Sequence, residues 1–158
     1  MTIPPTAMDE SPEPDVEAPP GWHANYPGAH YSSKRSLMTW SPRGELNAAR
    51  ADLLLRWLEA VEPRFGKFNR FVDLSQLTKV DLAYEDVAEI ARRRKERYAG
   101  EWVKTAILAV SPLAYGIARM YEQLLRSAPI QVHVVAQLAE AAEFLGVPSE
   151  ALRESADQ

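Results

Sequence analysis

Eight consecutive residues, Val103 to Val110, are almost wholly apolar and show no alternation of polar and apolar side chains. Only Lys104 and Thr105, near the start of the run, are polar. Such a run is typical of a strand that is covered on both faces within a parallel sheet. We therefore expect a central strand here, with Ile107 and Leu108 almost fully buried on opposite faces.

Helix signals alternate with strand signals along the chain. Ser111-Pro112 predicts a helix start, because a hydroxyl caps free N–H groups and a proline in the first turn has no N–H to satisfy. Asn47 is expected to cap an earlier helix that Pro63 and Gly66 end, and Gly146 ends the last one. The periodicity predicts further helices at about 82–98, 111–127 and 138–145, and strands at 29–33, 36–40, 68–74, 103–110 and 130–135.

This order predicts an α/β fold. Single helices between strands imply right-handed crossovers and therefore a mostly parallel sheet. We expect four to five strands, with an antiparallel N-terminal hairpin at one edge, alternating with about four helices.

The chain divides by composition near its start. Residues 1–33 hold seven of the twelve prolines and five acidic residues, but no Lys or Arg. A segment with so little apolar surface does not offset the entropy lost on ordering. We expect a disordered acidic tail at 1–28, one α/β domain at 29–147 and a C-terminal tail at 148–158.

Composition excludes several classes of function. The absence of cysteine removes disulfide, iron–sulfur and thiolate zinc chemistry, and the formal charge of −4 argues against a nucleic-acid binder. No apolar stretch reaches the roughly 20 residues of a membrane span, which favours a soluble protein of the cytoplasm. No serine has a histidine partner that would make it a nucleophile, and His133 has no second metal ligand within reach. We therefore expect no enzyme activity, no metal site and no cofactor.

Polar residues gather where the predicted strands end. In a parallel sheet, the crevice outside the carboxyl ends of the strands is where ligands and partners bind. The same residues also serve as ordinary turn and cap residues. The candidate binding residues at this edge are Arg43, Ser75, Thr78, Asp81, Tyr84 and Ser111.

A run of cations ends the second predicted helix. Arg92, Arg93, Lys95 and Arg97 belong to it and form a weak candidate for anion binding. The alternative is a solvated helix end, where cations stabilise the terminal carbonyl groups.

Residues at the strand ends resemble a known family. Asp73-Leu74-Ser75 followed by Val80-Asp81 is similar to the signature of STAS domains, the fold of bacterial anti-sigma factor antagonists. Gly44-Glu45-Leu46-Asn47 resembles the Gly-Glu-Leu-Asp before that family's first helix, and 139–146 resembles its closing helix. STAS-like domains that grade into the lipid-carrying CRAL-TRIO class fit the pattern as well.

The sequence departs from this family at its phosphorylation site. The antagonists have Asp-Ser-Ser/Thr-Gly, whereas this chain has Asp81-Leu82-Ala83-Tyr84. Ala83 offers no hydroxyl to a kinase, and Ser75 and Thr78 are only weak substitutes. The resemblance therefore implies a member without the standard switch.

Two functions remain open. The first is a non-catalytic regulatory module of bacterial signalling that binds a protein partner or a second copy of itself. The alternative is a domain that binds a lipid-like or nucleotide-like small molecule between its helices and its sheet. The aromatic residues available for such a pocket are Trp57, Tyr84, Tyr115 and Tyr121.

Overall fold

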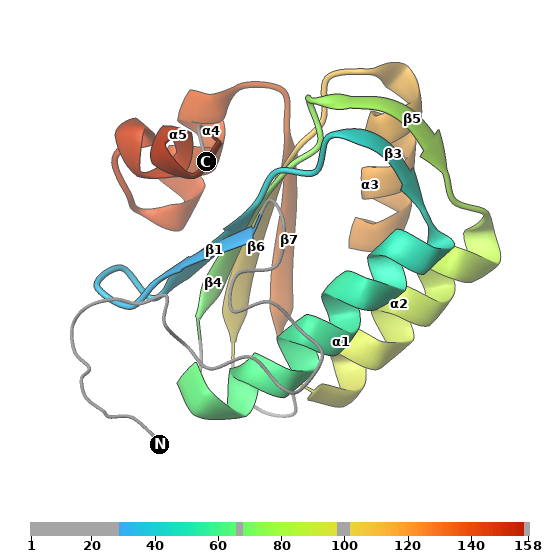
Figure 1. Ribbon diagram of the computed structural model, residues 1–158, viewed down its shortest axis with the longest axis horizontal. Helices are drawn as coiled ribbons and strands as arrows, with labels where there is room; N and C mark the ends of the chain where they lie inside the picture. Colours follow the sequence, from blue (N-terminus) through green and yellow to red (C-terminus); the bar gives the residue numbers. More distant parts are fainter. Residues whose placement is uncertain (1–28, 66–67, 98–101, 157–158) are drawn as a thin grey trace.

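A five-stranded sheet forms the centre of the computed structural model, which describes residues 29–65, 68–97 and 102–156 (Figure 1). The strands are β1 (Ala29–Ser32), β2 (Leu37–Trp40), β4 (Asn69–Asp73), β6 (Val103–Leu108) and β7 (Ile130–Val135). They lie in the order β1-β2-β4-β6-β7, with β1 antiparallel to β2 and the other neighbours parallel. The predicted α/β class, with its antiparallel edge hairpin, is confirmed.

The apolar run lies inside this sheet. β6 is flanked by β4 and β7, one strand away from the middle. Ile107 is 5% exposed and Leu108 is 7% exposed, and the two side chains pack into different cores. The prediction of burial on opposite faces is confirmed. A strand with a neighbour on each side and helices on both faces is shielded from water, and only Lys104 of β6 is partly exposed.

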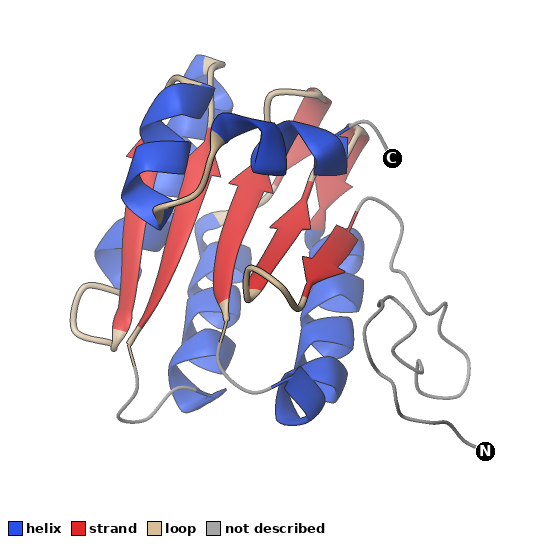
Figure 2. Cartoon of the chain, turned by 90° about the vertical axis from the view of Figure 1, so that its left-hand side faces the viewer, coloured by secondary structure: helices blue, strands red, loops and turns tan. Residues whose placement is uncertain are grey.

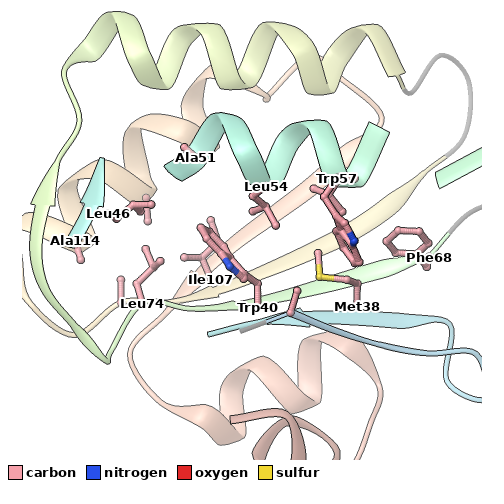
Figure 3. Close-up of a cluster of buried hydrophobic side chains, with 14 of the residues drawn as sticks. Met38, Trp40, Leu46, Ala51, Leu54, Trp57, Phe68, Leu74, Ile107 and Ala114 are labelled. Atoms are coloured by element: carbon pink, nitrogen blue, oxygen red, sulfur yellow. The ribbon is translucent and has the colours of Figure 1, made fainter. Parts of the chain in front are cut away.

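Helices cover both faces of the sheet (Figures 1 and 2). The helices of the described chain are α1 (Ala48–Phe65), α2 (Tyr84–Arg97), α3 (Pro112–Leu124), α4 (Leu138–Leu145) and α5 (Ser149–Ala156). The first three lie on one face, and α4 and α5 lie on the other. The larger core lies between α1 and the sheet, where Trp57, Leu54 and Met38 meet Trp40 and Phe68 (Figure 3).

The caps largely follow the sequence. The Asn47 side chain accepts a hydrogen bond from the Arg50 N–H at 2.9 Å, and Ser111 Oγ accepts one from the Ala114 N–H at 3.2 Å. Gly146 takes the left-handed conformation that closes α4, with φ 72°. Asp81 directly precedes the helix predicted at 82–98, where a cap residue would stand, but it is the last residue of a strand. Asp86 supplies the local bond and accepts from the Ala83 N–H at 2.8 Å.

A second, two-stranded sheet is formed by segments for which the sequence pattern predicts no strand. β3 (Gly44–Asn47) pairs in parallel with β5 (Leu77–Asp81). β3 follows β2 and β5 follows β4 along the chain, and the pair bends over towards the helices of the larger core (Figure 1). Leu46, Leu77 and Val80 pack into that core.

The end of the chain is also more ordered than expected. Residues 149–156 form a helix instead of a tail, and Leu152 is fully buried against the α4 face of the sheet. The packed part of the chain therefore extends beyond residue 147. The predicted tail at 1–28 lies outside the described residues.

Candidate interaction site

The carboxyl ends of the parallel strands meet at one edge of the sheet, as the arrowheads in Figure 2 show. Arg43 follows β2, Ser75 follows β4 and Ser111 follows β6. All three are exposed. The fold thus places these candidates where the strand directions predicted them.

The other candidates lie farther along the small sheet. Gly44 is the partner of Leu77, so Arg43 and Ser75 flank the start of the β3–β5 pair. Asp81 lies four residues beyond Leu77 on β5, which corresponds to about 13 Å at the usual rise per residue of a strand. Thr78, Asp81 and Tyr84 are all exposed on β5 and the start of α2. The six candidate residues therefore form two groups instead of one compact site.

The hydroxyl of Ser75 is engaged within its own turn. Its backbone N–H and its Oγ both donate to Asp73 Oδ1, at 2.9 Å and 2.6 Å. Asp73 itself is only 5% exposed. A phosphate on Ser75 would bring a second negative charge against this carboxylate, which makes Ser75 a poor substitute for the missing switch.

The turn between β6 and α3 carries two exposed apolar side chains that the sequence analysis missed. Val110 is 59% exposed and Leu113 is 58% exposed, on either side of Ser111-Pro112. The apolar run predicts that Val110 belongs to the buried strand. β6 ends at Leu108, however, so Val110 lies beyond the sheet. We call Val110, Ser111 and Leu113 the β6–α3 corner. The cap bond of Ser111 and the ring of Pro112 hold its backbone in place.

Part of the cation run binds the acids of α1. Arg93 donates to Asp52 at 2.6 Å and to Glu59 at 2.9 Å, so it joins α2 to α1. Arg92 pairs with Glu89 and Glu96 on its own helix, while Lys95 is exposed. Any anion would have to compete with these carboxylates, so the anion-binding hypothesis draws no support from this arrangement.

Arg97 supplies a hydrogen-bond donor near the end of α1, where Pro63 has no backbone N–H. Pro63 lies inside α1 and has no N–H for the carbonyl of Glu59, four residues earlier. Arg97 Nη2 donates to that carbonyl at 2.9 Å, and its Nε reaches the Glu62 carboxylate at 3.4 Å. α1 ends at Phe65, directly before Gly66, which is one of the two residues predicted to end it.

The Arg93 contact gives a prediction for pH. Its hydrogen bond holds the pKa of the Asp52 carboxyl below the ordinary value of 3.8. The stability from this pair is present above the unfolded pKa and is lost as the pH falls through the folded pKa, below about pH 4. We expect Arg93→Gln to raise the Asp52 pKa towards its ordinary value in a carboxyl NMR titration. Arg92→Gln, which removes no bond to Asp52, is the control, and an unchanged Asp52 pKa in Arg93→Gln would contradict the assignment.

The aromatic residues offered for a small-ligand pocket do not gather in one place. Trp57 is buried in the larger core, whereas Tyr84 and Tyr115 are exposed on α2 and α3. Tyr121 packs against the core, and burial raises the pKa of its hydroxyl. Small-ligand binding stays a prediction.

Within the described ranges, no three His, Asp or Glu side chains come together as ligands for a metal ion. No helix in the same part of the chain combines the length and the apolar character that a membrane span requires.

Comparison with known proteins places the fold. No protein-family model matches the sequence, and no curated protein matches it. The structure is similar to the crystal structure of an uncharacterized protein of the DUF3478 family from Shewanella loihica PV-4, described as having a SpoIIAA-like fold. The TM-score is 0.51 at 15% identity, over 75% of this chain and 90% of that chain. This chain has a SpoIIAA-like fold.

The SpoIIAA-like fold is the STAS-like architecture that the sequence motifs implied. At 15% identity the likeness carries the fold and no activity. In this structure Ala83, the residue that the motif resemblance places where the antagonists have a hydroxyl, is exposed directly before α2. Its side chain is a methyl group, so the start of α2 presents no acceptor for a phosphate at that residue.

Proposed function

We propose that this chain is a non-catalytic, SpoIIAA-like regulatory module of bacterial signalling in the cytoplasm. It binds a protein partner at the carboxyl edge of its sheet and works without a phosphorylation switch at Ala83. The observation that carries the proposal is the β6–α3 corner. Two apolar side chains more than half exposed, three residues apart on a capped turn, favour an interaction surface there.

The rest of the edge supports recognition of a protein. Ser75 follows β4, the strand beside β6, and Arg43 follows β2, one strand farther; both are exposed, so polar groups lie on one side of the apolar corner. An apolar centre with a polar rim is the usual anatomy of a protein interface. Asp81 and Tyr84, farther along β5 and α2, extend the surface that a partner would contact.

The test begins by trapping the partner. A photo-crosslinking amino acid at position 113, introduced in cells that naturally contain the protein, should join the chain to one discrete protein that mass spectrometry identifies. With that partner purified, we expect Leu113→Asp to weaken binding by about tenfold or more, because a charge at an apolar contact loses over 1 kcal/mol. Asp81→Lys tests the β5 end of the surface separately.

The matched control is Leu53→Asp, because Leu53 is an exposed leucine on α1, 41% accessible and away from the edge. It should leave the affinity unchanged. Equal affinity of Leu113→Asp and the wild type, at equal thermal midpoints, would remove the β6–α3 corner from the site.

A further inference from the structure

β7 ends the sheet on the side away from β1 (Figure 2), and no described strand pairs with its outer edge. The Val103 N–H donates to the Pro129 carbonyl at 3.1 Å, and the Ala109 N–H donates to the Val135 carbonyl at 3.0 Å. The carbonyls of Pro129 and Val135 therefore point from β7 towards β6, and the odd-numbered residues between them direct their backbone groups the same way. Alternation then directs the N–H and C=O groups of the even-numbered residues outwards. These residues are Ile130, Val132 and Val134. Ile130 is only 4% exposed, so the outward groups that a strand can reach are those of Val132 and Val134, which are half-buried.

This edge lacks the usual protection against strand pairing. Natural edge strands are kept short, or carry charged residues, prolines or bulges. β7 has six residues, Ile-Gln-Val-His-Val-Val, with no charge and no proline, and its register with β6 is regular. The opposite edge strand, β1, has only four residues. β7 is therefore the edge that is ready to accept another strand.

A groove with a volume of about 330 Å³ runs beside β7. Trp102, which is 61% exposed, lines it together with Arg126 of α3 and Phe144 of α4. The Phe144 ring is held by His133, with ring centres 5.0 Å apart, and by Lys104 Nζ, 5.2 Å from the ring centre. The groove is bordered by residues from both faces of the sheet, so there is room for the side chains of an added strand.

The side chains of β7 are complementary to those of an identical antiparallel strand. If the outward backbone groups pair about a two-fold axis at Val132, Val132 faces Val132 of the second copy and Ile130 faces its Val134. On the other sheet face, Gln131 faces His133 of the second copy. Branched apolar pairs and a neutral polar pair both stabilise neighbouring strands, and no like charges meet.

We propose that β7 pairs antiparallel with β7 of a second copy of this chain, which joins the two sheets into one. The contact lies on the edge strand and does not depend on the proposed partner site at the β6–α3 corner. The strand itself carries no charge, and its accessible outward groups at Val132 and Val134 are free of strand partners within the described residues, which favours an identical strand as the occupant.

Sedimentation velocity of the full chain should show a dimer. A double variant with Gln131→Lys and His133→Lys puts like charges opposite each other in this register and should be a monomer. The double variant with Gln131→Glu and His133→Glu should be a monomer for the same reason. Mixing the basic and acidic variants should restore the dimer as a heterodimer. Circular dichroism checks that each variant is folded.

A crosslink tests the register. The chain contains no cysteine, so Val132→Cys introduces a single thiol. Directly paired residues in antiparallel strands have Cα atoms about 5.5 Å apart, within the range of a disulfide. Mild oxidation should link most of the Val132→Cys protein into dimers, whereas Leu53→Cys, on α1, should stay monomeric.

Several outcomes would overturn the proposal. These are a wild-type monomer at all concentrations, a dimer that both charged variants retain, or a small molecule that co-purifies in the groove. Leu113→Asp should leave the dimer intact, so a failure at β7 is distinguishable from a failure of the proposed function.

Discussion

Glu62→Ala is expected to lower the free energy of unfolding by about 3–5 kcal/mol. Glu62 lies on α1 with its side chain 7% exposed, and its carboxylate accepts hydrogen bonds from Arg70 of β4 and Arg94 of α2. Those two guanidinium groups are 6% and 3% exposed. Removing the carboxylate leaves two positive charges close together inside the protein.

Urea unfolding measures this loss directly. Arg119→Ala is the control, because Arg119 forms a half-exposed pair with Glu122, and such pairs contribute at most about 1 kcal/mol. Glu62→Gln keeps the shape of the side chain but also removes the charge, so we expect most of the loss to remain. A loss below 1 kcal/mol in both Glu62 variants would show that water or another group compensates the arginines.

Leu152→Ala is expected to lower the free energy of unfolding by about 2–5 kcal/mol. Leu152 is fully buried on α5 and packs in the smaller core with Phe71, which is also fully buried, and Leu108. The substitution leaves a cavity on this face of the sheet. A chain that ends at residue 148 exposes the same core surface and should be destabilised further.

The control for α5 is Arg153→Ala, because Arg153 is the exposed neighbour of Leu152. This change should stay within about 0.5 kcal/mol in the same urea titration. If Leu152→Ala and the truncated chain both unfold at the wild-type urea concentration, the domain ends near residue 147 as the sequence analysis first placed it.

The candidate site was only partly predictable. Arg43, Ser75 and Ser111 were placed at the sheet edge correctly, because strand direction follows from the order of strands and helices. Val110 and Leu113 were missed, because apolar residues next to a buried strand are normally part of it. The one available signal was Pro112, because a helix that begins there leaves the residues just before it, Val110 among them, outside the sheet.

Local patterns were sufficient for the main sheet and its caps. A strand that is buried on both faces shows this in its own residues, as in Val103–Leu108, and a cap such as Ser111 acts on a residue only three positions away. In both cases the signal lies within a few consecutive residues, so it can be read from the sequence, although the strand itself is stabilised by its pairing with β4 and β7.

Features that depend on distant partners needed the tertiary structure. β3 and β5 are short and partly charged, and neither is a strand without the other, more than thirty residues away. From the sequence alone, the cations of α2 could contact an anion or water. In the structure, α1 places Asp52, Glu59 and Glu62 beside them. α5 has few apolar residues, and Leu152 is buried because the sheet leaves part of one face uncovered by α4. In each case the stabilising contact joins segments whose proximity is created by folding, so no local pattern encodes it.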